Sequence, residues 1–320
     1  MGLRMGLFSK NKKNAEIMAI RLGKDGLYSA SVRFSSGGLP VLEFLSFYPK
    51  AEQAWPVLLE RLARETPAKQ KQCLLQLNAN DYQWFAMDAL NVPADELKNS
   101  LVWRLKELID YPIESASFDV LTVPGDIQNG GRNQSLIAIV IANQQLSLQQ
   151  NLFADAKLPL SVIDVPEMAQ RNLSVRLEVE GRGLAMLSFD VHGGLLTVTY
   201  GGELYLSRRL DITSTDLGTQ DIRERDASFE RISLELQRSL DHFDRQHNYI
   251  TTAKLVVSPL GEVATLLQQY LASNMYLPVE IMDLAQIVNL EKIPELKSAE
   301  RQGAFLSIIG AALRQEASAT

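Results

Sequence analysis

The order of secondary-structure elements that the sequence predicts occurs twice, at positions about 170 residues apart. In each copy three strands are joined by two short turns, and a helix and a further strand follow. The first copy begins at Ile17 and the second at Leu184. Few residues are identical between the copies, so the shared feature is the order of elements. A repeat of this kind predicts two related α/β lobes with a cleft between them.

A separate block follows the first copy, between about residues 80 and 142. It reads as strand, helix, strand and strand, and leucines recur at helical spacing from Leu97 to Leu108. We interpret it as a small subdomain inserted in the first lobe. The expected boundaries are a flexible basic leader over 1–14, a first lobe over 15–178, a second lobe over 179–297 and a C-terminal helix over 298–320 that returns to the first lobe.

The composition is that of a globular protein with a buried core, because 46% of the residues are hydrophobic and 22% are charged. The formal net charge is −6, whereas a nucleic-acid-binding surface normally brings a basic excess, so we expect no nucleic-acid partner. Cys73 is the one cysteine and lies in an apolar run. We expect it to be a small core residue in a reducing compartment, without a disulfide or a catalytic role.

No run of about 20 apolar residues is present, so we expect no membrane-spanning helix and at most a peripheral membrane contact. The leader leaves two interpretations open. Leu7 and Phe8 precede Lys10, Lys12 and Lys13, a pattern that favours contact with anionic lipid. The alternative is a disordered chain end.

The first hairpin of each repeat is a candidate nucleotide site. Glycine in such a turn lets backbone N–H groups approach phosphate oxygens, and an acidic residue at a strand end can hold Mg²⁺. A plain structural turn is the alternative for each hairpin. A further candidate is a strand-to-helix turn in which Pro259 lacks a backbone donor. The candidate residues are Arg21, Gly23, Lys24, Asp190, His192, Gly193, Gly194 and Gly261.

Other motifs for nucleotide binding or catalysis do not occur. The sequence has no GxxxxGK[ST], no GxGxxG and no GxSxG, and its His and Cys residues lack the spacing of a metal site. We therefore expect no catalytic residue and no metal ligand.

Several segments, in this order and spacing, resemble the PilM group of actin-like pilus assembly proteins, and within it the members that serve MSHA-type pili. The resemblance covers nearly the whole chain. The segments that carry it are Glu16–Gly23, Trp84–Pro112, Val162–Asn172, Asp190–Gly193, Leu277–Asp283 and Gly310–Arg314.

This resemblance implies an actin-like fold (FtsA/PilM-like, ribonuclease H-like) with two lobes, and a cytoplasmic location peripheral to the inner membrane. It implies that the protein binds the cytoplasmic tail of a PilN-like inner-membrane protein, and that it acts with other pilus assembly components. Family members bind ATP in the cleft, and they bind an extended peptide between the first lobe and its inserted subdomain. By this resemblance Tyr82, Trp84 and Phe85 are expected to form one wall of the peptide groove.

Two departures from the family pattern concern the nucleotide. Arg21 stands where the family has an acidic residue, and an Arg cannot bind Mg²⁺. Pro259-Leu260-Gly261 stands where the family has a Gly-Gly pair. We therefore expect an adaptor that binds ATP weakly or not at all, with Mg²⁺ only if ATP binds. The alternatives are an active ATPase of this fold and a sugar- or acetate-kinase-like enzyme, which would need an acidic general base.

Overall fold

The computed structural model describes residues 16–89, 92, 96–126 and 134–315. The predicted leader 1–14 lies outside these residues. The chain divides into two compact units. The first comprises Met1–Leu27, Phe47–Val165 and Glu316–Thr320, and the second comprises Tyr28–Ser46 and Pro166–Gln315. The lobe and subdomain boundaries expected from the sequence stay predictions.

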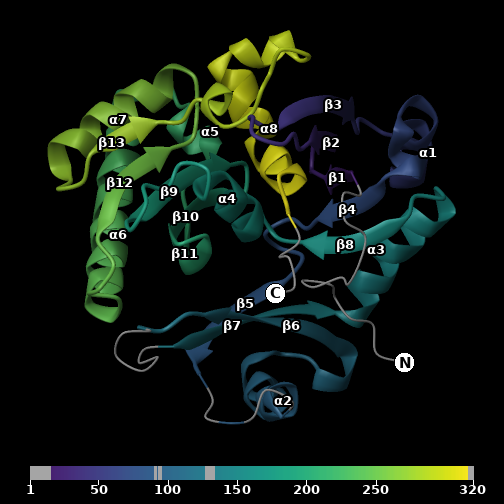
Figure 1. The fold of residues 1–320 in the computed structure, drawn as a ribbon, viewed down its shortest axis with the longest axis horizontal. Coiled ribbons are helices and arrows are strands. Elements are labelled where there is room, and N and C mark those ends of the chain that lie inside the picture. Colours follow the sequence, from purple (N-terminus) through teal and green to yellow (C-terminus); the bar gives the residue numbers. More distant parts are fainter. Residues whose placement is uncertain (1–15, 90–91, 93–95, 127–133, 316–320) are drawn as a thin grey trace. The chain divides into compact units, whose positions relative to one another are not determined.

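Within the described residues the strands form two sheets of five strands and one of three (Figure 1). The first large sheet has the order β3-β2-β1-β4-β8 and the second has the order β11-β10-β9-β12-β13. The strands of the first are β1 (Ile17–Leu22), β2 (Gly26–Arg33), β3 (Val41–Pro49), β4 (Gln72–Gln76) and β8 (Leu160–Asp164). Those of the second are β9 (Gly183–Asp190), β10 (Gly193–Tyr200), β11 (Glu203–Leu210), β12 (Thr252–Val257) and β13 (Val279–Ile281).

The two large sheets have the same topology. In each, the third strand of the meander lies at the edge and the first pairs in parallel with the next strand along the chain, β1 with β4 and β9 with β12. A second parallel pair follows, β4 with β8 and β12 with β13. The repeat predicted from the order of elements is therefore present in the strand topology.

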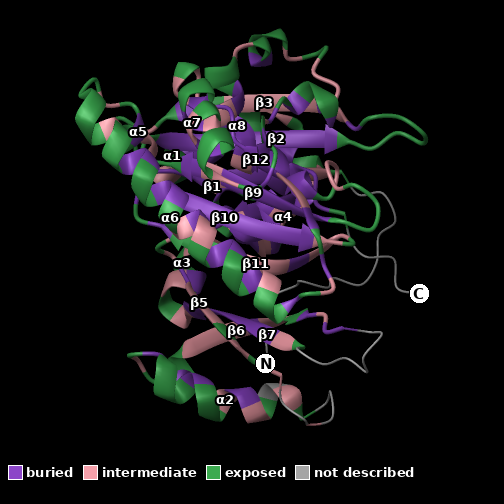
Figure 2. Cartoon of the chain, turned by 90° about the vertical axis from the view of Figure 1, so that its left-hand side faces the viewer, coloured by how far each residue is buried: buried purple, intermediate pink, exposed green. Residues whose placement is uncertain are grey.

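The helices fall largely where the apolar spacing predicts them. They are α1 (Trp55–Glu65), α2 (Leu97–Leu108), α3 (Asn143–Asp155), α4 (Pro166–Ser174), α5 (Ser214–Leu217), α6 (Ile222–Gln246), α7 (Glu262–Asn274) and α8 (Ala299–Ala312). Helix α6 shows the pattern clearly, with buried and exposed residues alternating along its length (Figure 2). Asp221 caps it by accepting hydrogen bonds from the N–H groups of Arg223 and Glu224. Its apolar side packs into the core of the second unit.

The three-stranded sheet has the order β5-β7-β6 and comprises β5 (Gln83–Asp88), β6 (Ala116–Val123) and β7 (Ser135–Ala142). Helix α2 covers one of its faces (Figure 1). Leu105 of the helix and Ala138 and Val140 of β7 belong to one buried cluster, against which Phe85 packs. The predicted order of strand, helix, strand and strand is thus present in this sheet.

In the second unit, helices α4 and α8 pack closely together. A Cβ added to Gly310 of α8 would clash with the carbonyl oxygen of Ala169 on α4, so this contact requires a glycine. The side-chain amide of Asn172 donates to the carbonyl oxygen of Gly310 over 3.0 Å. These contacts tie the last helix to the helix that precedes β9.

Helix α8 begins at Ala299, and Ser298 caps it. Gly303 lies within this helix, and a glycine is required there because a Cβ would clash with the carbonyl oxygen of Pro259. No helix in the described part of the chain is long and apolar enough to cross a membrane.

Candidate functional site

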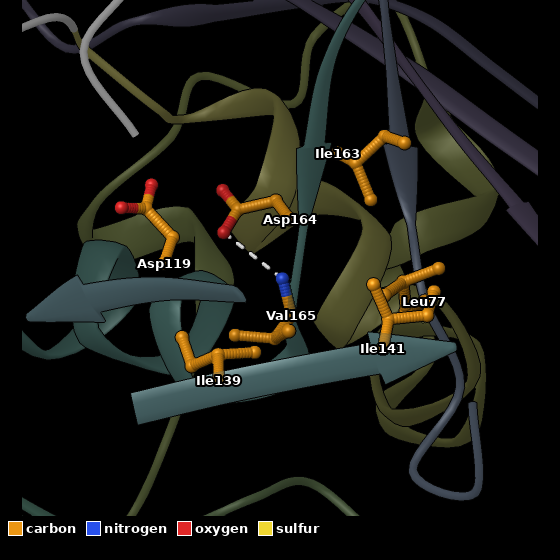
Figure 3. Close-up of a pocket in the computed structure, with 7 residues that line it drawn as sticks. All are labelled: Leu77, Asp119, Ile139, Ile141, Ile163, Asp164 and Val165. Carbon is orange, nitrogen blue, oxygen red and sulfur yellow. Dashed lines mark hydrogen bonds between the residues drawn. The ribbon is translucent and has the colours of Figure 1, made fainter. Parts of the chain in front are cut away.

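A pocket in the first unit lies where the carboxyl ends of β4 and β8 approach the three-stranded sheet (Figure 3). It contains about 350 Å³ of empty space, part of which is open to solvent. The residues that line it are Leu77, Asp119, Ile139, Ile141, Ile163, Asp164 and Val165.

The strand register explains which side chains reach this pocket. Ile139 of β7 is paired with Trp84 of β5 and with Asp119 of β6. Directly paired residues in antiparallel strands share one face of a sheet, and neighbouring residues point to the other face. Ala138 and Val140 therefore face α2, whereas Ile139 and Ile141 face the pocket. Helix α2 covers one side of the sheet and leaves the other available to the pocket.

Two buried carboxylates belong to the lining. Asp119 Oδ1 accepts the N–H of Val120, and Asp164 Oδ1 accepts the N–H of Val165, each over 2.9 Å. Asp119 is 9% exposed and Asp164 is 2% exposed. Figure 3 shows the two carboxyl groups on one side of the pocket, with the side chains of Ile139, Ile141 and Leu77 toward the other. The pocket therefore combines an apolar wall with an end that carries two carboxyl groups.

The residues expected to form the peptide groove take different places. Tyr82 is buried just before β5, and Trp84 is half-buried on the same face as Ile139. Phe85 lies on the opposite face and packs against the α2 cluster. Their role as a groove wall stays a prediction.

The first candidate nucleotide hairpin joins β1 to β2 in the first unit. Gly23 and Gly26 exchange two backbone hydrogen bonds, of 2.8 and 3.2 Å, across the turn. Lys24 is exposed at the tip, and Arg21 lies half-buried in β1, opposite Gln76 of β4. Gly23 and Gly26 therefore close a tight turn. This is what the alternative interpretation of the hairpin, a plain structural turn, predicts.

The second candidate hairpin joins β9 to β10 in the second unit. Asp190 Oδ1 accepts the N–H of His192 over 2.7 Å, so this carboxylate holds its own turn. Gly193 has a φ of +138°, and an added Cβ would lie 2.7 Å from the carbonyl oxygen of Leu210. A Cβ on Gly194 would lie 2.8 Å from the ring of Phe189. Packing within the sheet thus accounts for both glycines.

Gly261 is the N-cap of α7 and has a φ of +62°. A Cβ added there would lie 3.1 Å from Oε1 of Glu300, so an acidic side chain lies beside the start of the helix. The positive end of a helix dipole attracts anions, and a carboxylate at that place competes with a phosphate and repels it. The described residues at this turn therefore fit a phosphate poorly.

Two of these candidate elements follow the carboxyl ends of neighbouring strands in the second large sheet. β12 and β9 are parallel neighbours, and the N–H of Ser258 donates to the carbonyl oxygen of Leu187 over 2.8 Å. The turn at Gly261 and the hairpin at Asp190 thus follow adjacent strands. The side-chain hydroxyl of Ser258 is buried there and makes no hydrogen bond to any described residue.

The pocket was not predicted from the sequence, although two aspartates in apolar strands could have indicated it. Asp119 stands between Phe118 and Val120 in a strand, and Asp164 ends the buried strand that begins at Leu160. Aspartate is seldom almost fully buried, so an acidic residue within an apolar strand marks a special site. What the sequence did not reveal is that the two residues line the same pocket.

Neither Cys73 nor a cluster of metal ligands adds a site in the part of the chain that the structure describes. Cys73 is fully buried, and burial raises the pKa of its thiol to about 12, so the nucleophilic thiolate is scarce at neutral pH. Among the residues that the structure describes, no three or more His, Cys, Asp or Glu side chains are grouped in a way that could hold a metal ion.

No family model matches the sequence, and no curated protein matches it. Two solved structures resemble the fold over most of its length. A chain of a PilM-PilN type IV pilus biogenesis complex has a TM-score of 0.67 and 18% sequence identity, and the match covers 95% of this chain and 99% of that one. A Bacteroides thetaiotaomicron protein with an actin-like ATPase fold and unknown function has a TM-score of 0.50 and 11% identity, with 88% and 96% covered.

These similarities define the class of the fold. The chain has an actin-like α/β fold, as the sequence resemblance predicted. Its likeness to the chain of the PilM-PilN complex supports the PilM-like form of that fold.

Proposed function

We propose that this protein is a cytoplasmic adaptor of a type IV pilus machine, which binds the cytoplasmic tail of a PilN-like inner-membrane protein. The similarity to a chain of the PilM-PilN complex carries this proposal, because it extends over 95% of the protein and 99% of that chain. We further assign the protein to MSHA-type pili, on the sequence segments that resemble that branch of the family.

The pocket of the first unit is the proposed binding site for the tail. It is apolar, partly open to solvent and formed by β4, β8 and the three-stranded sheet, in the region where the family resemblance places an extended peptide. β5 is also an edge of that sheet, so a tail could pair its backbone with this strand while one side chain enters the pocket.

The proposed adaptor does not depend on ATP. Three features support a nucleotide site that has lost its function: Arg21 replaces an acidic residue, the carboxylate of Asp190 accepts a hydrogen bond from His192, and Glu300 lies beside Gly261. An arginine cannot bind Mg²⁺, and an acidic side chain at the start of α7 opposes phosphate.

Binding of a fluorescent peptide of the tail tests the adaptor function. We expect an affinity in the micromolar range, typical of a short peptide that must become ordered on binding. Ile139→Trp fills the pocket and is expected to weaken binding at least about tenfold, as lost burial of one apolar side chain would. Trp103→Ala, on the exposed side of α2, is the matched control and should leave binding unchanged. Failure of the wild-type protein to bind the tail would contradict the proposal.

Calorimetry with ATP and Mg²⁺ tests the alternative of an active ATPase. We expect no binding with micromolar affinity and no phosphate release above background. Phosphate release that is lost in Asp190→Ala would instead support an ATPase. Product formation with a panel of sugars or with acetate would support a kinase-like enzyme.

A further inference from the structure

We infer that the exposed face of α7 is a contact surface for a second copy of this chain, whose own α7 packs against it in antiparallel orientation about a two-fold axis. The inference is independent of the adaptor function and of the pocket in the first unit. This α7 face comprises exposed residues of the helix together with a tyrosine that follows it: Leu266, Gln269, Ala272, Ser273, Asn274 and Tyr276.

The α7 face carries no charge. Between Glu262 and Glu280 the sequence has no charged residue, although 22% of the chain is charged and a run of this length normally contains several. An uncharged run is ordinary where a helix is buried, but this one lies at the surface of the second unit. Because the centres of protein interfaces are depleted of charged residues, the pattern is typical of a contact surface.

The polar side chains of this face are already hydrogen-bonded within the chain. The hydroxyl of Ser273 and the amide of Asn274 each donate to a backbone carbonyl oxygen one turn earlier in the helix, over 3.0 and 2.7 Å. The hydroxyl of Tyr276 donates to Asp244 Oδ2 over 3.0 Å. Removing a polar group from water costs most where its hydrogen bond is lost. The α7 face can therefore be buried at a lower cost than its composition suggests.

Exposed apolar side chains supply the attraction. Leu266 is 40% exposed and Tyr276 is 60% exposed. Helix α6 packs beside α7 (Figure 1), and its Leu234, which is 44% exposed, follows Ser233, whose hydroxyl contacts the sulfur of Met275 over 4.0 Å. Burial, and then the hydrogen bond of its hydroxyl, raises the pKa of Tyr276 to about 12, so the phenol stays uncharged. A tyrosine offers a large contact area at a low cost in conformational entropy.

The distribution of charge favours a second copy of the chain as the occupant. Each copy carries a formal net charge of −6, so two copies repel each other least where the faces in contact are uncharged. In a two-fold contact, residues at the axis meet their own copies, and a charged residue there would meet a like charge. Gln269 lies midway between Leu266 and Ser273 on the helix, and its amide both donates and accepts hydrogen bonds. It is therefore suited to the axis.

The size of the face sets the strength of the contact. Helix α7 has 13 residues and is therefore about 20 Å long. A helix of this length, with the adjoining side of α6, covers less than the area of about 800 Å² per partner that stable complexes bury. We therefore expect a weak dimer rather than a permanent one.

Sedimentation velocity of the full chain, up to several hundred micromolar, tests the inference. We expect a reversible equilibrium between monomer and dimer with a Kd on the order of 100 µM, as for interfaces at the low end of the size range. A protein that stays monomeric at every concentration would overturn the inference.

Two substitutions at Gln269 assign the dimer to this face. Gln269→Glu and Gln269→Lys each place like charges across the axis, so each variant alone should dimerise at least about tenfold more weakly than the wild type. An equimolar mixture of the two should regain the dimer, because a carboxylate then meets an ammonium group. Gln144→Glu, at an exposed position of α3, is the matched control and should dimerise as the wild type does. Circular dichroism reports whether each variant folds.

Three further results would also overturn the inference. One is a dimer that Gln269→Glu leaves intact, since the contact would then lie elsewhere, and another is a mixture of the two variants that dimerises no better than either alone. The third is a monomeric protein whose Gln269→Glu variant binds the proposed tail more weakly, which would give this face to the tail. The adaptor function is tested by binding of the tail to the wild-type protein, so either proposal can fail without the other.

Discussion

Arg209 on β11 donates to the buried carboxylate of Glu167 at the start of α4, with 2.6 Å between Nη2 and Oε1. The glutamate side chain is 1% exposed and that of the arginine is 38% exposed. Glu167 also lies in the first turn of α4, where the helix dipole favours a negative charge. This ion pair connects the helix to the edge strand of the second large sheet.

The first prediction concerns this ion pair. Arg209→Ala should lower the free energy of unfolding by about 2 kcal/mol, because it leaves the buried charge of Glu167 with fewer partners. The loss is smaller than for a fully buried pair because solvent screens the partly exposed arginine. Urea denaturation measures the change. Arg208→Ala removes an exposed arginine from the adjacent position and should change the free energy by less than about 0.5 kcal/mol. Equal losses of unfolding free energy in both variants would contradict the prediction, since the ion pair would then contribute no more to stability than an exposed arginine does.

The second prediction concerns the contact between α4 and α8. Gly310→Ala should destabilise the protein by about 2 kcal/mol, because the new methyl group clashes with a carbonyl oxygen that cannot move without its helix. Gly218→Ala is the control, since an added Cβ there comes no closer than 3.4 Å to any neighbour. Thermal unfolding compares the two variants. An unchanged melting temperature for Gly310→Ala would mean that the helices separate at little cost.

The third prediction concerns pH. His247 is 4% exposed, and burial first, with the nearby His242 second, lowers its pKa from the ordinary value near 6.5. The folded protein therefore binds a proton at His247 less readily than the unfolded chain does. This group's contribution to stability is complete above the ordinary pKa and declines as the pH falls below about 6.5.

The variant His247→Phe tests this, because phenylalanine keeps a ring among Tyr205, Tyr249 and Phe243 but takes up no proton. Unfolding by urea at several pH values should show a smaller loss of stability between pH 7 and pH 5 than in the wild type. His192→Phe changes a histidine in a turn and serves as the control. Parallel pH curves for wild type and His247→Phe would contradict the prediction.

Much of the fold was predictable because its signals are local. The strands of both meanders follow from short runs bounded by glycine-containing turns, and α6 follows from apolar spacing that runs from Phe229 to Phe243. The glycine within α8 is not explained by local sequence, because Gly303 is a poor helix former and the reason for it is tertiary, the close approach of Pro259.

The candidate site was harder to predict because its parts are distant in sequence. Asp119, Ile139 and Asp164 come from β6, β7 and β8, and Leu77 directly follows β4. Only the arrangement of those strands brings the four residues to one pocket. The place of Glu300 beside Gly261 likewise depends on packing between α8 and the start of α7. Single-sequence patterns give the faces of strands and helices but not which faces meet.

The central claim is that the pocket binds the partner's tail without help from a nucleotide. Fluorescence anisotropy of a labelled tail peptide, with and without saturating ATP and Mg²⁺, tests it most directly. The account predicts the same micromolar affinity, within about twofold, in both conditions, since a ligand with no differential effect shifts no equilibrium. Binding that appears only with ATP and Mg²⁺ would contradict it.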